Sequence, residues 1–406
     1  MVSRRRTSPA AKPLDDDDLL AEILLRLAPK PSSLPRASLV CKRWRSIATD
    51  AAFRRRFRAH HRKPPILGVF EECFNEIKFT PLLDPPDRIP PERLSLDLSD
   101  NICTWSVLGC RHGCVLLLDP WDKALLVFEP VSGDTHRVLM PPEFVLDGFT
   151  EANATVFCAA GDDDHGRHVH GDCHTSPFKV AVVCSGTGSH AEVAIARVYS
   201  QETGTWGGLV SSAQPCAAGV TFQTAILSGN VLYWGLYGIG DADEEYGILK
   251  FDLDNQSLTV ITNTPPAPPV DSQTQVIHRL QVIRAEDAGL GIAVLSYPSF
   301  QLWDCVVDLH GVATWVMRRT VDMDTMLGEK AEYTDMAGYA EDADAIVLSM
   351  YETPAADGDF SRYDFDPSRR VLFTVHLESM EAEKHHGIFR TGDYHPFANF
   401  YTAVKP

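Results

Sequence analysis

Hydrophobic residues near the start of the chain follow a helical spacing. In the stretch DDDDLLAEILLRL the leucines and the isoleucine recur three and four positions apart, which predicts a helix ending near Leu27. Asp15 to Asp18 favour its N-terminus, because carboxylates accept hydrogen bonds from the free amides and oppose the helix dipole. The apolar residues cover more than one face, so some of them need a partner other than water.

Two further helices are expected before residue 58. The segment APKPSS interrupts the first helix, and a second is predicted over about 34–40, with Pro35 in its first turn, where the missing N–H costs nothing. A third contains Cys41, Trp44 and Ile47, and an aromatic pair spaced four residues apart follows it. Residues 14–58 therefore predict a helical module, with a disordered basic tail over 1–13 and a linker over 59–65.

From residue 66 onward the pattern changes to short apolar runs. Runs such as CVLLLD, ALLVFEP, KVAVVC and AIVLSMY alternate with Gly, Pro, Asp and Asn, which is typical of successive β-strands and tight turns. More than a dozen strands are predicted, and helical patterns almost vanish. The fold class is thus multidomain, a small all-α module followed by an all-β domain.

One hairpin unit recurs along this all-β region, as FEPVSGDTHRV, VYSQETGTWGGLV, FDLDNQSLTVI, VDLHGVATWV and FDPSRRVLFTV. Its anchors are 71, 52, 56 and 58 residues apart, at Phe128, Tyr199, Phe251, Val307 and Phe365. This spacing is close to the roughly 50 residues of a kelch-like propeller blade. Residues 66–403 therefore predict a six- or seven-bladed β-propeller. A pair of β-sandwiches is the rival architecture, but it would give strands without a long period.

Charge separates the two regions. The whole chain has 37 Lys+Arg and 55 Asp+Glu, a net charge of −18. Residues 1–63 hold 16 basic and 6 acidic residues, whereas the remainder holds 21 and 49. A chain this acidic is expected to bind polyanions and membrane surfaces poorly. Nucleic acid and membrane are therefore not expected partners. No apolar run approaches the roughly 18–20 residues of a membrane span, and the first residues lack a signal-peptide core.

These features predict an intracellular protein, cytoplasmic or nuclear. Its ten cysteines have no tight spacing framework and are expected to be reduced and mostly buried.

The helical module resembles an F-box. The resemblance rests on the leading leucine with its acidic stretch, on LL-x-EIL-x-RL and on V-C-K-R-W. It implies binding to the Skp-type adaptor of SCF (Skp, cullin, F-box) ubiquitin ligases. By their positions in the motif, nine residues are candidates for contact with the adaptor: Leu14, Leu19, Leu20, Ile23, Leu24, Leu34, Val40, Cys41 and Trp44. F-boxes commonly open with Leu-Pro, whereas Asp15 follows Leu14 here. The alternative is a helical cap that packs only on its own C-terminal domain.

The all-β region extends this resemblance. GNVLYWGL, ILKFDL, LGIAVLS, LWDCVVDLHGVATWV and HPFANFY occur in the order seen in the F-box-associated propeller of plant F-box proteins. Together the motifs cover about residues 14–403. They imply a substrate-recognition subunit that joins an unidentified protein target, through the Skp-type adaptor and cullin, to ubiquitination and proteasomal degradation. A degenerate F-box on a ligase-independent scaffold or ligand-binding propeller is the alternative.

No catalytic, cofactor or metal site is predicted. The loop GDDDHGRHVHGDCHTSP concentrates possible zinc ligands over residues 162–174, but it lacks a second paired support and is interpreted as a polar insertion. SGTGS at 185–189 is interpreted as a turn, and DADEE (241–245) and EDADA (341–345) as solvated loops. Four tryptophans are assigned to blade cores, namely Trp206, Trp234, Trp303 and Trp315. A propeller hydrolase would need a cluster of catalytic groups that no motif indicates.

Overall fold

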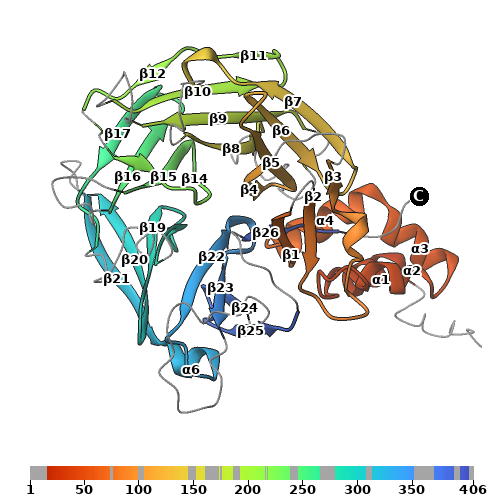
Figure 1. Ribbon diagram of the computed structural model, residues 1–406. Coiled ribbons are helices and arrows are strands. Elements are labelled where there is room, and N and C mark those ends of the chain that lie inside the picture. Colours follow the sequence, from red (N-terminus) through yellow and green to blue (C-terminus); the bar gives the residue numbers. More distant parts are fainter. Residues whose placement is uncertain are drawn as a thin grey trace, which may run out of the picture.

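The computed structural model (Figure 1) places two structural regions in one chain. It describes residues 16–73, 76–98, 105–144, 152–160, 173, 176–185, 193–214, 216, 218–237, 246–265, 279–307, 313–351, 370–387 and 394–401. An N-terminal group of helices precedes an all-β domain, as the sequence predicts.

The N-terminal helices number four within residues 16–61, namely α1 (Asp17–Leu25), α2 (Ser33–Ser38), α3 (Lys42–Thr49) and α4 (Ala51–His61). The carboxylate of Asp16 caps α1 by accepting from the amides of Asp18 and Leu19, at 2.8 and 3.3 Å. Asp50 caps α4 by accepting from the amide of Phe53 at 2.8 Å. The aromatic pair expected after the third helix thus belongs to a separate helix, which extends into the segment predicted as a linker.

The described strands form six antiparallel sheets that surround a central axis (Figure 1). The first blade contains β26 (Tyr394–Ala398), β1 (Ile66–Cys73), β2 (Glu76–Pro81) and β3 (Leu96–Asp97); the second, β4 (Ser106–Arg111), β5 (Cys114–Asp119), β6 (Ala124–Glu129) and β7 (Asp134–Leu139); the third, β8 (Ala152–Cys158), β9 (Phe178–Cys184), β10 (Ile195–Ser200), β11 (Thr205–Trp206) and β12 (Val210–Ser211).

The remaining three blades follow in chain order. The fourth contains β13 (Gly219–Val220), β14 (Ile226–Ser228), β15 (Val231–Tyr237), β16 (Tyr246–Asp252) and β17 (Ser257–Ile261); the fifth, β18 (Leu280–Arg284), β19 (Leu290–Ser296), β20 (Ser299–Val307) and β21 (Ala313–Asp322), with α6 (Met323–Leu327) after it; the sixth, β22 (Thr334–Ala340), β23 (Ala345–Tyr351), β24 (Arg370–His376) and β25 (Ala382–His385). The domain is therefore a six-bladed β-propeller.

The ring is closed by strands from the two ends of the domain. Strand β26 pairs antiparallel with β1, so that Phe70 lies opposite His395. It also contacts β22 of the sixth blade and β4 of the second. Closure of this kind removes the unpaired sheet edges that an open array would leave at its ends.

The hydrophobic core lies between neighbouring blades. Phe70, Phe79 and Phe397 form one aromatic group beside the second blade, with ring centroids 5.3 Å apart for Phe70–Phe79 and 5.4 Å for Phe70–Phe397. Burial alternates along β2 and β20, whereas β19 and β23 are buried over almost their whole length inside their blades. Their central strands are apolar on both faces, because each sheet is covered by the blades on either side of it.

The recurring hairpin is confirmed at four of its five predicted positions. In the second, third and fourth blades it joins β6 to β7, β10 to β11 and β16 to β17, and the anchors Phe128, Tyr199 and Phe251 each pair across it. Val307 ends β20 at the same place in the fifth blade. The fifth prediction is wrong, because VLFTV belongs to β24 and the equivalent hairpin joins β24 to β25; Phe365 lies outside the described residues. Turn residues occur at both ends of a strand, so the sequence alone does not show which of two successive turns belongs to the repeated hairpin.

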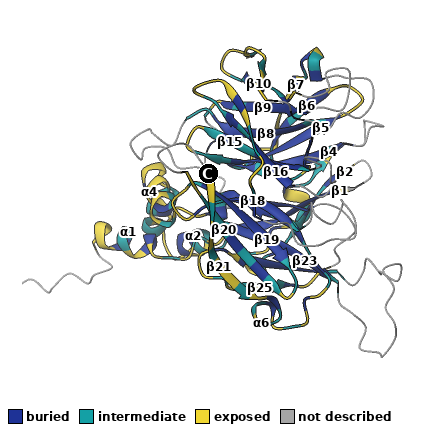
Figure 2. Ribbon diagram, turned by 90° about the vertical axis from the view of Figure 1, so that its left-hand side faces the viewer, coloured by how far each residue is buried: buried dark blue, intermediate teal, exposed yellow. Residues whose placement is uncertain are grey.

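The helices lie against one face of the propeller (Figure 2). The Lys63 ammonium, just after α4, contacts Asp344 at 3.1 Å and Glu378 at 2.9 Å in the sixth blade. The amide of Ser32 donates to the Asp87 carboxylate at 2.9 Å, next to the first blade. These contacts link the helical region to the propeller at two places. In the part of the chain that is described, no helix has the length and apolarity to cross a bilayer.

Candidate functional site

The helical module carries exposed apolar side chains. Leu19 and Ile23 on α1 are 49% and 43% exposed, and Leu39 and Val40, directly after α2, are 74% and 61% exposed. Cys41, which precedes α3, is also exposed. We call Leu19, Ile23, Leu39 and Val40 the apolar surface of the module. Exposed aliphatic groups of this size are candidate contacts for a partner.

Other candidates from the sequence form the interior of the same module. Leu20, Leu24 and Leu34 are at most 2% exposed and pack with Phe53 and Phe57 of α4. Trp44 is half-buried against this core. Leu14 lies outside the described residues. The buried leucines therefore hold α1 in place, and the exposed residues are the ones available to a partner.

Leu39 was missed by sequence reasoning, although it belongs to the same surface. Residues 34–40 were predicted to be one helix, in which Leu39 had no special position. The structure ends α2 at Ser38, so the next two residues, Leu39 and Val40, both project from the turn. The LVC stretch could have indicated that Leu39 is exposed, because three consecutive apolar residues cannot all face the interior of a short helix.

Two ion pairs link α1 to the helices that follow it. The Arg43 guanidinium lies 2.5 Å from the Asp17 carboxylate, and that of Arg56 lies 2.7 Å from Glu22. These pairs are exposed, and such pairs contribute about 0–1 kcal/mol each. They orient α1 relative to α3 and α4 without adding much stability.

A buried charge network fills the propeller axis. The Arg111 guanidinium is 1% exposed, and its Nη2 atom lies 2.5 Å from Oε2 of Glu341, while Oε1 of Glu341 lies 2.5 Å from Arg284. Arg111 also donates to the Thr155 hydroxyl at 2.8 Å and to the carbonyl oxygen of Ala225. The network thus connects the second to the sixth blade through one carboxylate that two arginines share.

This network corrects one prediction from the sequence. EDADA was interpreted as a solvated loop, but Glu341 is 6% exposed and lies in a short 3-10 helix (Glu341–Ala343) at the axis. Asp342 accepts a 2.7 Å hydrogen bond from the amide of His112. Composition could not show this, because the partners of Glu341 are 230 and 57 positions away in sequence.

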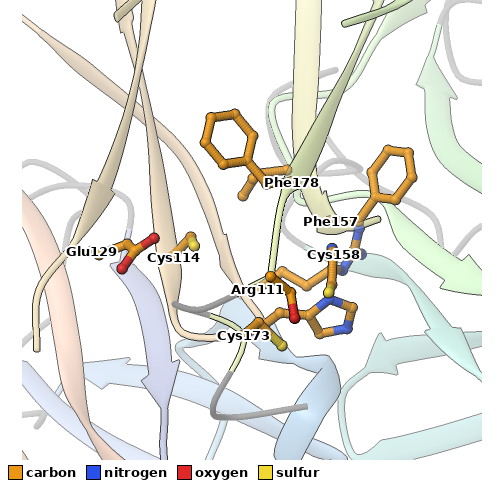
Figure 3. A pocket seen from close by; sticks show the side chains of 10 residues that line it. Arg111, Cys114, Glu129, Phe157, Cys158, Cys173 and Phe178 are labelled. Carbon is orange, nitrogen blue, oxygen red and sulfur yellow. The ribbon is translucent and has the colours of Figure 1, made fainter. Parts of the chain in front are cut away.

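A small pocket in the second and third blades contains several sulfur atoms (Figure 3). Cys114, Cys158 and Cys173 line it together with His112, and its volume of about 10 Å³ admits no more than one water. Burial raises the pKa of the Cys114 thiol, which keeps it protonated and unreactive. Among the described residues no three His, Cys, Asp or Glu side chains are placed to hold a metal ion.

The other candidate chemistry has mixed outcomes. Of the His-rich stretch 162–174 only Cys173 is described, and DADEE and most of SGTGS lie outside the described residues. Trp234 is fully buried, and Trp206, Trp303 and Trp315 are half-buried against the cores between blades, as expected. The cysteines of the described part are free thiols, most of them buried.

Comparison with known proteins identifies the helical module. Residues 17–59 match the F-box-like family model. No curated protein matches the chain. A protein of unknown function from Bacteroides caccae aligns at a TM-score of 0.43 and 10% identity, over 82% of this chain and 98% of its own. The Dos1 propeller aligns at 0.37 and 9%, over 80% and 68%. Similarities this distant carry no argument about function.

Proposed function

We propose that this chain is the substrate-recognition subunit of an SCF-type ubiquitin ligase. Its F-box-like module binds a Skp-type adaptor and, through it, cullin, while the propeller binds a protein target. Other subunits of the complex carry out the ubiquitin transfer that commits the target to proteasomal degradation. The complex acts in the cytoplasm, the nucleus or both.

The apolar surface of the module is the observation that carries this proposal. Leu19, Ile23, Leu39 and Val40 have no function inside the fold, since the interior of the module is complete without them. Covering them removes apolar area from water, which stabilises a complex by about 25 cal/mol per Å² before the costs of association. The F-box-like match covers these residues, and F-box domains in general bind Skp-type adaptors.

The test is adaptor binding by the purified full-length chain, measured by calorimetry with a purified Skp-type adaptor. The double variant Leu19→Asp, Ile23→Asp should weaken binding at least about 100-fold, because it places unpaired charges in the interface. Leu139→Asp is the matched control, since Leu139 is 66% exposed on the propeller and its substitution should leave adaptor affinity unchanged. Failure of the wild-type chain to bind would favour a ligase-independent scaffold instead.

A further inference from the structure

A large cavity opens where the helical module meets the propeller. Its volume is about 570 Å³, within the roughly 300–1,000 Å³ of ligand-binding pockets. Its wall is formed by the end of α4, the turns after β18, β22 and β24, and part of β21. Both regions of the chain therefore contribute to one concave surface.

Most of the carboxylates in this wall are occupied by partners in the protein. Asp344 and Glu378 both hold Lys63, and these contacts outweigh the effect of burial and raise the pKa of the ammonium. Glu341 is held by Arg284, and Asp342 accepts from a backbone amide. Glu286 is the remaining wall carboxylate, and it is exposed.

Three wall arginines retain donors toward the cavity. Arg62 is exposed at the end of α4, where its backbone has a φ of 59°, and within the described residues no ion pair is found for it. Arg319 uses Nη1 on the backbone carbonyl of Glu378 at 3.2 Å, which leaves other guanidinium N–H groups. Arg318 lies 3.4 Å from Asp304. The wall holds five basic and five acidic residues, but the arginines with donors left over, Arg62, Arg318 and Arg319, outnumber the one remaining carboxylate, Glu286.

Two exposed valines lie on the same face of the fifth blade as Arg318. Val316 lies opposite Asp304 in the β20–β21 pair, and Asp304 contacts Arg318, so the three side chains share one face of the sheet. Val306, two positions beyond Asp304, also faces this side. Both valines are 53% exposed. An aliphatic strip thus borders the part of the cavity wall that carries Arg318.

We propose that this cavity binds an acidic peptide segment of the target protein. A carboxylate or phosphate group of the segment contacts Arg62, Arg318 and Arg319, for which guanidinium forks are well suited. A neighbouring aliphatic side chain packs on Val306 and Val316. This inference deepens the proposed function by naming the chemistry of the target. It rests on the proposed function only in assuming that the bound protein is then ubiquitinated.

The experiment is a selection from a display library of random short peptides on the immobilised full-length chain. We expect enrichment of peptides with Asp or Glu beside Val, Leu or Ile. Fluorescence anisotropy with the enriched peptides should show at least a tenfold loss of affinity for Arg62→Glu, Arg319→Glu. The milder Arg62→Gln, Arg319→Gln variant should show a smaller loss in the same direction. Resynthesis with phosphoserine in place of the acidic residue shows which anion the arginines prefer.

The control is Arg137→Glu, at an exposed arginine of the second blade, which should leave peptide affinity unchanged. Enrichment of neutral or basic peptides, an absence of enrichment, or equal affinity of the control and the double variant would overturn the inference. Adaptor binding is measured on the same proteins. Adaptor binding without acidic-peptide binding would refute this site alone, and the reverse result would refute only the ligase function.

Discussion

The carboxylate of Glu341 in the sixth blade lies 2.5 Å from the guanidinium of Arg111 in the second blade, although the first blade separates the two along the ring. The same carboxylate holds Arg284 of the fifth blade and accepts from the amide of Leu227 in the fourth, at 3.1 Å. One side chain therefore ties together blades that share no strand pairing.

Removal of Glu341 should weaken the whole propeller. The variant Glu341→Ala leaves the buried Arg111 and the partly exposed Arg284 without their carboxylate, and breaking a buried pair costs about 3–5 kcal/mol. Chemical unfolding followed by tryptophan fluorescence measures the change in free energy. The control is Asp122→Ala, which removes the partner of Arg137 from an exposed pair and should cost less than about 1 kcal/mol. Equal effects of the two variants would contradict the role of the network.

Closure of the ring should depend on Phe397. This side chain is 1% exposed and packs against Phe70 and Phe79 of the first blade. Phe397→Ala should lower the free energy of unfolding by about 3–5 kcal/mol, because it removes buried apolar area and leaves a cavity. Tyr401→Ala, at a half-buried residue next to the same blade, should cost less. An unfolding midpoint equal to that of the wild type would contradict the packing described.

Substitution of Leu20 should destabilise the helical module, as expected for a core residue. Leu20→Ala should destabilise the module by about 2–5 kcal/mol, since the side chain is fully buried. Hydrogen exchange separates the regions: amides of α1 to α4 should exchange faster, while those of the blade strands should not change. Leu19→Ala is the matched control, and it should leave the exchange of the module almost unaltered. Equal exchange in the two variants would show that Leu20 is not a core residue.

His385 should make the propeller less stable in mild acid. Burial lowers its pKa below the usual 6.5, while its ring bridges the Leu82 carbonyl oxygen, at 3.1 Å, and the Thr374 hydroxyl, at 2.8 Å. As the pH falls through 6.5, the unfolded chain takes up a proton that the folded chain does not, so stability decreases until the pH passes below the folded-state pKa.

Urea unfolding between about pH 7.5 and 5.5 tests this prediction. Stability of the wild type should fall more steeply with acidification than that of His385→Gln, which cannot titrate. The two chains contain the same other histidines, so the difference between their slopes reports His385. Parallel slopes would show that His385 titrates alike in the folded and unfolded states.

The sequence predicts local features better than long-range ones. Asp16 and its neighbours start α1 as expected, because helix capping depends on adjacent residues. The alternation around Phe128, Tyr199 and Phe251 predicts the hairpins, since turn residues and strand periodicity are also local. The sequence separates Leu19 from Leu20 poorly, because both lie in one apolar run, and only the packing of α4 determines which is buried. Arg111 and Glu341 could not be paired, since their contact depends on closure of the ring.

The pairing of Phe70 with His395 sets an order of events during synthesis. A ribosome adds about 5–20 residues per second, so β26 emerges on the order of tens of seconds after β1. Until then the first blade lacks its innermost strand, and Phe70 and Phe79 lack their partner Phe397. The nascent chain thus exposes part of an aromatic surface that β26 later covers, and a chain that stops short of β26 would display the same surface to the quality-control machinery of the cell.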